Sequence, residues 1–550
     1  MKDTGVRSTE FYSYLYDLKQ WAGEGIRTLN LRDKKGNDLL LPAYNEIEKT
    51  DENQMDPIEI YAYYIGLYIN NMNNGIYLDY LLSFPVTYEK STRKNILSSF
   101  ERGLRKSLPQ SIIMDDEIMS RFNVVAGASE PAAYAICALE EYGFDPDDKE
   151  KVFYGIFDFG GGTADFDFGL WTKSKDDDLY DYRIEHFGTQ GDRYLGGENL
   201  LQLIAFEVFA ENVDLCRMEK IPFAKPIELL NIPTELMGFV NDSQEARMNQ
   251  KLMMEKIRPF WERSNGNGEE VVDINEYCEF QIGLFNVEGT LKSNLAFEVD
   301  IEKLNEIIIT RIEKGVKQFF EALKDTFTSK HIEKTGSAAK INIFLAGNSS
   351  KSPILKEVFQ RNIDEWNKGI IDNKRNGDEN SHFILFPPLG TEEAINIQKE
   401  RGIGNSVQLE APTGKTGVAW GLIEGREGGR IEVIEEVAFE SETKFAYCLG
   451  IQKGKNFFMK IHRDEAYFKW VKFLPAKRKI NEILYTSLPE ASSGNLSSSE
   501  TGVLRKRIEI PYVSEDDFIY IRFVSVNDIE YAIGDLDGKV DESSVRQEKF

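Results

Sequence analysis

The stretch with the clearest chemical potential is residues 151–171, KVFYGIFDFGGGTADFDFGLW. An apolar run ends at Asp158, three glycines follow at Gly160, Gly161 and Gly162, and polar residues then alternate with apolar ones. Because alternation with a period of two is typical of a strand with one buried face, we predict a strand, a glycine turn and a second strand.

Glycines allow positive φ and close approach of another group, and successive amides in such a turn can bind an anion. The carboxylates of Asp158 and Asp165 at the same end would repel a bare phosphate. They suit Mg²⁺, which prefers oxygen ligands and bridges to phosphates. The stretch therefore predicts a magnesium–phosphate site, and the alternative is a plain hairpin turn with solvated acids.

Composition limits the function classes. The chain has 550 residues, 41% of them hydrophobic, and a formal charge of −26, which disfavours nucleic acid or an anionic membrane as the main partner. Its four cysteines form no CxxC pair, so we expect reduced and mostly buried thiols in a cytoplasmic protein. We find no apolar run of membrane-spanning length and no apolar signal core at the N-terminus.

Other segments carry weaker signals of nucleotide chemistry. Ser129-Glu130-Pro131 reads as a capped helix start with a carboxylate in its first turn, and Gly196-Gly197 also opens a helix. Residues 341–353 read as a buried strand, a small polar loop and a helix start, the layout of many nucleotide sites. Lys19 lies in YDLKQW, where a surface lysine is the simpler interpretation.

The sequence also sets expectations for domain organisation. We predict an inserted subdomain over about residues 216–296 and, from the alternating apolar runs, a β-rich domain over residues 431–550. A P-loop is excluded, because Leu409 stands where the glycine before Gly414-Lys415-Thr416 would be needed.

Taken in order, FDFGGGTADFD, SEPAAYA, GDRYLGGEN, FLAGNSSKSPIL and YDLKQW resemble the nucleotide-binding domain of the seventy-kilodalton heat-shock (DnaK-type) chaperones, members of the actin-like ATPase superfamily. The resemblance covers roughly residues 11–425. It implies an α/β chain with a two-lobed actin-like ATPase fold over residues 1–430, followed by a smaller β-rich domain. It also implies ATP and Mg²⁺ as cofactors, hydrolysis of ATP between the lobes, and protein or peptide clients, with co-chaperones as further partners.

The resemblance assigns roles residue by residue. Asp158 and Asp165 would hold Mg²⁺ through water, Glu130 would orient the attacking water, and Lys19 would offset developing charge. Phosphate contacts would come from Gly160, Gly161, Gly162, Thr163, Gly196 and Gly197. Gly347, Asn348 and Ser349 would lie near the ribose and base, and Lys351 stands where the family has an adenine-stacking arginine.

Three departures weaken the expected activity. We expect the family's first phosphate hairpin, a DxGTT-type motif ahead of the lysine segment, to be missing because the sequence begins too late to contain it. Asn348 replaces the second glycine of the adenosine motif, and PTGKTGVAWG carries no acid in the second connecting helix. From the missing hairpin we expect poor ATP binding, little hydrolysis and a tendency to self-associate through an open sheet edge.

Three further functions fit parts of the pattern. A sugar or acyl kinase could share the fold, although Glu130-Pro131 argues against it. An actin-like filament protein would also share the fold, and so would a nucleotide-binding pseudoenzyme that serves as an interaction module.

Overall fold

The computed structural model describes residues 18–25, 28–32, 38–47, 56–72, 75–86, 88, 90–175, 179–192, 194–229, 232–263, 273–327, 340–373, 383–403, 411–435, 445, 447–463, 465, 468–486, 491, 496–500, 502–524, 528–536 and 538–549. The segment YDLKQW is described only from Leu18, and Leu409 lies outside these ranges.

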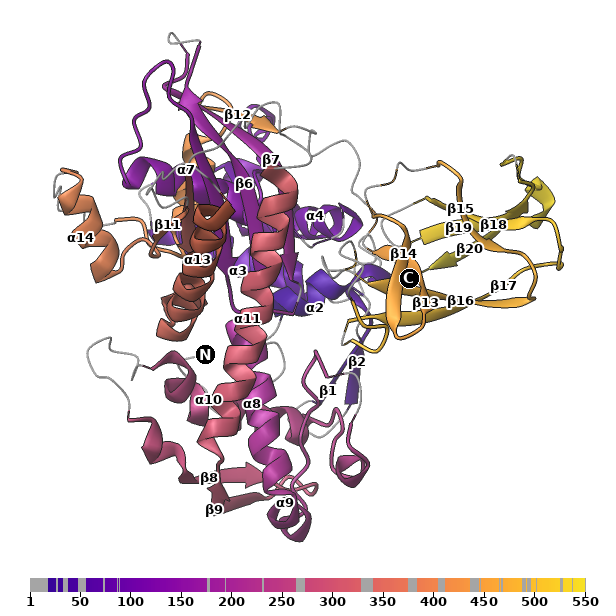
Figure 1. Cartoon of the computed structure of the whole chain (residues 1–550). Coiled ribbons are helices and arrows are strands. Elements are labelled where there is room, and N and C mark those ends of the chain that lie inside the picture. The colour runs from indigo at the N-terminus through magenta and orange to yellow at the C-terminus, as the bar shows by residue number, and fades with distance from the viewer. Residues whose placement is uncertain are drawn as a thin grey trace. The chain divides into compact units, whose positions relative to one another are not determined.

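Helices and strands alternate along the chain, so the fold is α/β (Figure 1). The helices are α2 (Leu18–Glu24), α3 (Pro57–Met72), α4 (Lys90–Ser107), α5 (Gln110–Ile113), α6 (Asp116–Met119), α7 (Glu130–Glu141), α8 (Gly197–Glu211), α9 (Val213–Glu219), α10 (Gln244–Glu262), α11 (Ile301–Asp325), α13 (Pro353–Asn373), α14 (Glu392–Glu400) and α15 (Gly417–Glu424). The strands through residue 435 are β1 (Leu29–Arg32), β2 (Asp38–Leu41), β3 (Asp79–Leu82), β4 (Asn123–Ala126), β5 (Val152–Phe159), β6 (Ala164–Lys173), β7 (Tyr182–Asp192), β8 (Glu279–Phe285), β9 (Leu291–Glu298), β10 (Ile341–Ala346), β11 (Phe383–Phe386) and β12 (Ile431–Glu435).

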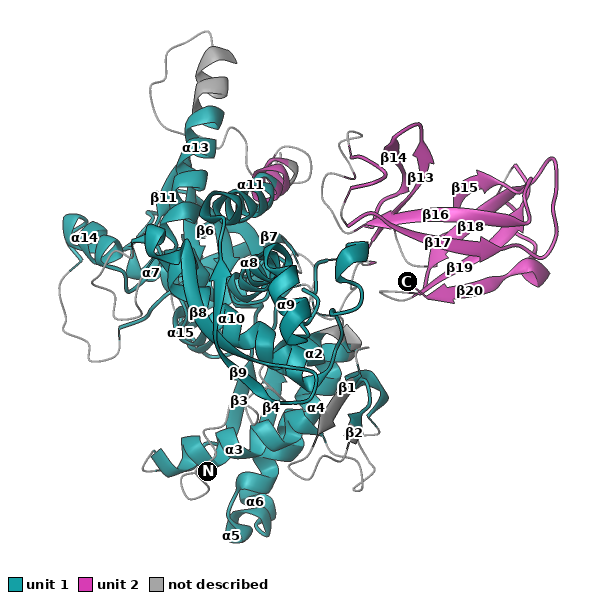
Figure 2. Ribbon diagram, turned by 90° about the horizontal axis from the view of Figure 1, so that it is seen from below, with its two compact units in different colours: residues 1–317, 331–434 teal, residues 318–330, 435–550 magenta. Residues whose placement is uncertain are grey.

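The chain divides into two compact units, coloured separately in Figure 2. Unit 1 comprises residues 1–317 and 331–434, and unit 2 comprises residues 318–330 and 435–550. Residues 216–296, predicted to be an inserted subdomain, contain α10 and the β8–β9 hairpin and belong to unit 1. Their independence as a subdomain stays a prediction.

A six-stranded sheet organises unit 1, in the order β11-β10-β5-β6-β7-β12. β10 lies parallel to both β11 and β5, whereas β6 runs antiparallel to both of its neighbours, β5 and β7. The predicted strand, glycine turn and strand are confirmed as the β5–β6 hairpin. All eight residues of β5 are buried, as expected for a central strand.

Helices cover both faces of this sheet. On one face Tyr154 and Ile156 share a core with α7. On the other face, Phe157 packs edge-on against Phe359 of α13, with ring centroids 4.9 Å apart. α7 and α15 cross so closely that a Cβ on Gly421 would lie 1.7 Å from the carbonyl oxygen of Ala133. The sheet is thus enclosed, and only its strand ends remain for chemistry.

A second, much smaller parallel sheet pairs β3 with β4. The apolar residues of β3 favour a buried strand, but its four residues are exposed or half-buried. β4 is the only described strand that pairs with it, so little covers the sheet. Nearby in sequence, α3 turns Tyr61, Tyr64 and Tyr68 to solvent.

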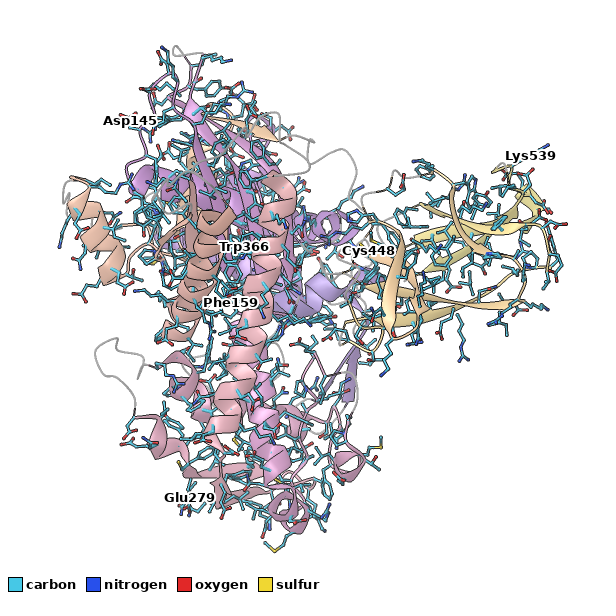
Figure 3. The ribbon with its side chains drawn as sticks, in the orientation of Figure 1. Asp145, Phe159, Glu279, Trp366, Cys448 and Lys539 are labelled. Atoms are coloured by element: carbon cyan, nitrogen blue, oxygen red, sulfur yellow. The ribbon has the colours of Figure 1, made fainter. Side chains whose placement is uncertain are left out.

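Unit 2 contains two antiparallel four-stranded sheets, ordered β14-β13-β16-β17 and β15-β18-β19-β20. These strands are β13 (Cys448–Lys453), β14 (Asn456–Ile461), β15 (Val471–Pro475), β16 (Ile480–Thr486), β17 (Leu504–Glu509), β18 (Phe518–Phe523), β19 (Asp528–Gly534) and β20 (Arg546–Lys549). Cys448 and Lys539 lie toward opposite ends of the unit (Figure 3). The prediction that residues 431–439 join these strands was wrong for β12, which lies beside β7 in the unit 1 sheet, because alternation indicates a strand without naming its partner.

The prediction that the cysteines are mostly buried is confirmed. Cys137, Cys216 and Cys448 are buried and Cys278 is exposed, and all four are free.

Candidate active site

Two carboxylates lie side by side at one end of the unit 1 sheet. Asp158 is near the end of β5, one residue before Phe159 (labelled in Figure 3), and Asp165 is near the start of β6. The two residues are direct partners in the β5–β6 register, so their side chains point to the same face. Only 7% of Asp158 and 1% of Asp165 is exposed.

Burial of this pair makes it hard to ionise. Burial raises the pKa of Asp158 well above its usual range, and the neighbouring Glu130 and Asp165 carboxylates raise it further. Burial and Glu130 likewise raise the pKa of Asp165 to about 7, against opposing hydrogen bonds from Thr163 Oγ1 (2.7 Å) and the Val86 amide (3.0 Å). Two adjacent buried carboxylates therefore lack a matching positive charge, which a divalent cation would provide.

The glycine turn between the strands leaves amides available. The turn is closed by the amide of Gly160, which donates to the carbonyl of Thr163 at 3.0 Å. The amides of Gly161 and Gly162 donate to no other described residue. These donors lie next to the carboxylate pair, so an anion bridged by a cation could use both.

Glu130 reaches the same place from the start of α7. Ser129 caps the helix by accepting from the Ala132 amide, as predicted, and the Glu130 amide donates to the Phe84 carbonyl at 3.1 Å. The carboxylate accepts a hydrogen bond from Lys19 Nζ at 2.9 Å. Partial desolvation lowers the pKa of Lys19, but Glu130, Tyr88 and Asp165 together more than offset this and leave the pKa raised, so Lys19 stays charged.

These groups line one cavity of about 270 Å³ within unit 1. The predicted site residues in its lining are Lys19, Glu130, Asp158, Gly160, Gly161, Gly162, Thr163 and Asp165. The other lining residues are Gln20, Gly23, Pro85, Tyr88, Tyr194, Glu198 and Gln202. Segments far apart in the sequence thus converge on the carboxylate pair.

Gly196 and Gly197 support the turn from behind instead of lining the cavity. The amides of Gly197 and Glu198 donate to the carbonyls of Gly160 (3.0 Å) and Gly161 (2.8 Å). A Cβ on Gly196 would lie 2.2 Å from the Gly161 carbonyl oxygen, so only glycine fits. The Gly197 amide, which was expected to contact a phosphate, therefore already donates its hydrogen bond within the protein.

The predicted adenosine segment also packs against the hairpin. Gly347 follows β10 with φ +80°, and a Cβ there would lie 2.5 Å from Asp158 Oδ1. Ser349 Oγ donates to the Gly160 carbonyl at 3.0 Å. Gly347, Asn348, Ser349 and Lys351 are outside the cavity lining, so their expected contacts with ribose and base stay predictions.

The turn before α8 is held by a buried ion network. Arg311 of α11 donates to Asp192 at 2.9 Å and to Glu228 at 2.7 Å. Asp192 in turn accepts from the amides of Tyr194 and Leu195. The long helix α11 thereby fixes the segment that leads to Gly196.

Sequence reasoning missed several lining residues. Glu198, in the first turn of α8, lines the cavity and forms a two-pronged ion pair with Arg258 at 2.6 and 3.0 Å. Its place after a helix-opening glycine pair was an available signal, since acids favour helix starts. Gln20, Tyr88 and Gln202 also line the cavity, and nothing in their local sequence indicates it.

No three His, Cys, Asp or Glu side chains among the described residues are close enough to enclose a metal ion directly. No protein-family model matches the chain, and a search of curated proteins finds no similar sequence. No helix within the described ranges is both long and apolar enough to cross a membrane.

Proposed function

We propose that this chain is a chaperone-like ATP-binding protein that hydrolyses ATP in the unit 1 cavity and couples nucleotide state to protein binding by its C-terminal β-rich part. One observation carries the proposal. The buried pair Asp158 and Asp165 lies beside the amides of Gly161 and Gly162, which donate to no described residue, within a cavity that also contains Lys19 and Glu130.

The donor chemistry fits Mg²⁺. The groups next to the turn are carboxylate oxygens, without a histidine or thiolate in the lining. The pair is buried and short of positive charge, and too few of the described side chains are close enough to enclose an ion, so most ligands would be water and phosphate oxygens. When bound, Mg²⁺ would supply the positive charge that lets phosphates approach these acids.

The chain's own residues would position and stabilise the reacting groups. The glycine-turn amides would bind phosphate oxygens, and Lys19 would stay charged and offset negative charge that develops on them. Glu130, which is 20% exposed and faces the cavity, would accept a hydrogen bond from the attacking water and orient it.

The sheet arrangement supports the actin-like, two-lobed part of the proposal. Ligands of open α/β sheets bind outside the carboxyl ends of strands. The cavity lies at the carboxyl end of the central strand β5, where Asp158 lines it. The order of the sequence motifs that resemble DnaK-type chaperones also supports an actin-like, two-lobed fold.

A nucleotide-binding module with little turnover is the second candidate. It is favoured by the 2.9 Å pairing of Lys19 with Glu130, because a carboxylate held by a lysine is less available to orient water. Comparison of nucleotide binding with single-turnover hydrolysis separates the two functions.

Calorimetric titration of ATP, with and without Mg²⁺, tests the site. We expect Asp158→Ala to weaken Mg²⁺-dependent binding at least tenfold, because it removes half of the carboxylate pair. Asp145→Ala is the matched control: Asp145 accepts a hydrogen bond from Tyr182 and lies outside the cavity lining. Equal Mg²⁺-dependent affinities for Asp158→Ala and the unchanged protein would refute the assignment.

A further inference from the structure

Unit 2 buries apolar side chains on both faces of the sheet that contains β13, β14, β16 and β17. Adjacent residues on each strand point to opposite faces. Leu449 and Ile483 join the core shared with the other sheet, whereas their neighbours Cys448 and Leu484 belong to a second cluster on the outer face. This outer cluster consists of Cys448, Phe457, Leu484, Ala491, Leu496 and Val503, with Met459 packed against it.

A short segment of the chain, Leu496–Ser497–Ser498, lies across this outer cluster; we call it the strap. The Phe457 amide of β14 donates to the Leu496 carbonyl at 2.8 Å, and the Ser498 amide donates to the Lys455 carbonyl at 2.8 Å. Asn456 and Ser497 are paired in antiparallel fashion between these bonds. The strap is therefore a miniature strand added to the outer edge of β14.

The strap occupies both features that recognise an extended peptide. A sheet edge supplies main-chain hydrogen bonds, and pockets for alternate side chains supply specificity. The strap takes the edge through Leu496 and Ser498, and it fills the pocket with one side chain, that of Leu496, which is 6% exposed. Ser497 and Ser498 are absent from the apolar cluster.

We propose that the strap is an autoinhibitory pseudo-ligand: it covers a strand-addition site on β14 that takes an extended peptide segment with a leucine-sized apolar residue. This inference rests on the proposed role of unit 2 in protein binding and adds the site and its regulation. A client segment would replace the strap, pairing antiparallel to β14 and placing its apolar side chain among Cys448, Phe457 and Leu484.

The described contacts that hold the strap can be named one by one. Its release loses the main-chain hydrogen bonds to Phe457 and Lys455, the hydrogen bonds from its serine hydroxyls to the Lys455 carbonyl, the hydrogen bond from Arg505 to the Ser498 carbonyl, and the burial of one leucine. A client segment of similar chemistry restores the same backbone bonds and the same apolar contact. Because burial of one leucine side chain corresponds to roughly a tenfold to hundredfold change in an equilibrium constant, loss of Leu496 should shift the competition by that factor.

The first test uses the full chain and a fluorescein-labelled peptide with the strap's own sequence, residues 494–500 (GNLSSSE). We expect Leu496→Ser to bind this peptide at least tenfold more tightly than the unchanged chain, as measured by fluorescence anisotropy. The control is Leu536→Ser, since Leu536 is a leucine of the same unit that is 69% exposed. Equal or weaker binding by Leu496→Ser would overturn the proposal.

The second test keeps Leu496 and fixes the strap covalently. Asn456 and Ser497 form a pair flanked by hydrogen bonds, the geometry in which facing side chains are closest, so Asn456→Cys with Ser497→Cys should form a disulfide. Oxidised, this variant should lose peptide binding, and reduction should restore it. The single variant Ser497→Cys controls for the new thiol.

The combined outcomes separate this inference from the proposed ATPase function. The proposal that the strap covers a peptide site is overturned if oxidation of the double variant leaves peptide binding unaffected. It is also overturned if no protein binds the peptide in either redox state. ATP binding is measured on the same samples, and its loss counts against the unit 1 assignment alone, because the two ligands are read independently.

Discussion

Replacement of Arg311 by methionine should destabilise unit 1 severely. Arg311 is 9% exposed and is held between Asp192, also 9% exposed, and Glu228. Methionine keeps much of the apolar stem and removes the charge. Two carboxylates are then left in a poorly solvated place without the cation that balances them.

The size of the effect follows from removal of one partner of a buried pair, which typically costs about 3–5 kcal/mol. Arg361→Met is the matched control, because Arg361 pairs with Glu313 of the same helix, α11, on the surface. An exposed pair contributes about 0–1 kcal/mol, so the two variants should differ by at least about 2 kcal/mol.

The assay is chemical denaturation at pH 5 and pH 8. Burial already raises the pKa of Glu228, and loss of the Arg311 charge should raise it further. In the variant the folded state then holds a proton that the unfolded chain releases, so its stability falls as pH rises through the folded pKa. The penalty of Arg311→Met should therefore be smaller at pH 5 than at pH 8.

A second change checks the same reasoning. Addition of Glu228→Gln to Arg311→Met removes one of the two unpaired carboxylate charges. In a double-mutant cycle it should therefore recover part of the lost free energy of unfolding. A penalty that matches that of Arg361→Met, or one that is equal at the two pH values, would show that the network contributes packing and not charge balance.

Three further predictions concern the site and the frame that holds it. Glu130→Gln should lower kcat at least a hundredfold with ATP affinity little altered, by single-turnover hydrolysis and calorimetry; unchanged hydrolysis would make Glu130 only a helix-start charge. Because the pKa of Asp165 is about 7, Mg²⁺-dependent ATP affinity should rise about tenfold from pH 6 to pH 8, by the ratio of its ionised fractions. Asp165→Asn removes this titration and should show a flatter profile in the same calorimetric measurement. Gly421→Ala should lower the free energy of unfolding by roughly 1–3 kcal/mol through overpacking, and so lower the melting temperature measurably. Gly75→Ala, where a Cβ meets open space, should leave the melting temperature unchanged.

Local patterns in the sequence were enough to predict the secondary-structure elements around the site. The β5–β6 hairpin, the Ser129 cap and the opening of α8 by Gly196-Gly197 depend on turn chemistry and periodicity within a few residues. The acidic pair could be predicted because Asp158 and Asp165 flank one tight turn. Hairpin geometry then places them together without further information.

Contacts between residues far apart in the chain could not be predicted from the sequence. Nothing local to Arg258 indicates that α10 brings it to Glu198, and nothing local to Val433 indicates that β12 joins the unit 1 sheet rather than unit 2. The apolar residues of β3 favour burial, but burial depends on what covers a strand, and only β4 pairs with it among the described strands. Strand partners and ion pairs depend on the whole fold.

The crossing of α7 and α15 has a consequence for tracing the ancestry of this chain. At 1.7 Å from a backbone oxygen, position 421 admits no side chain, and Gly417 is similarly confined, with a Cβ 2.9 Å from the ring of Tyr134. Such contacts constrain evolution by geometry and not by chemistry. A distant homologue that keeps this helix crossing must retain a glycine at position 421, even where every residue around the cavity has diverged.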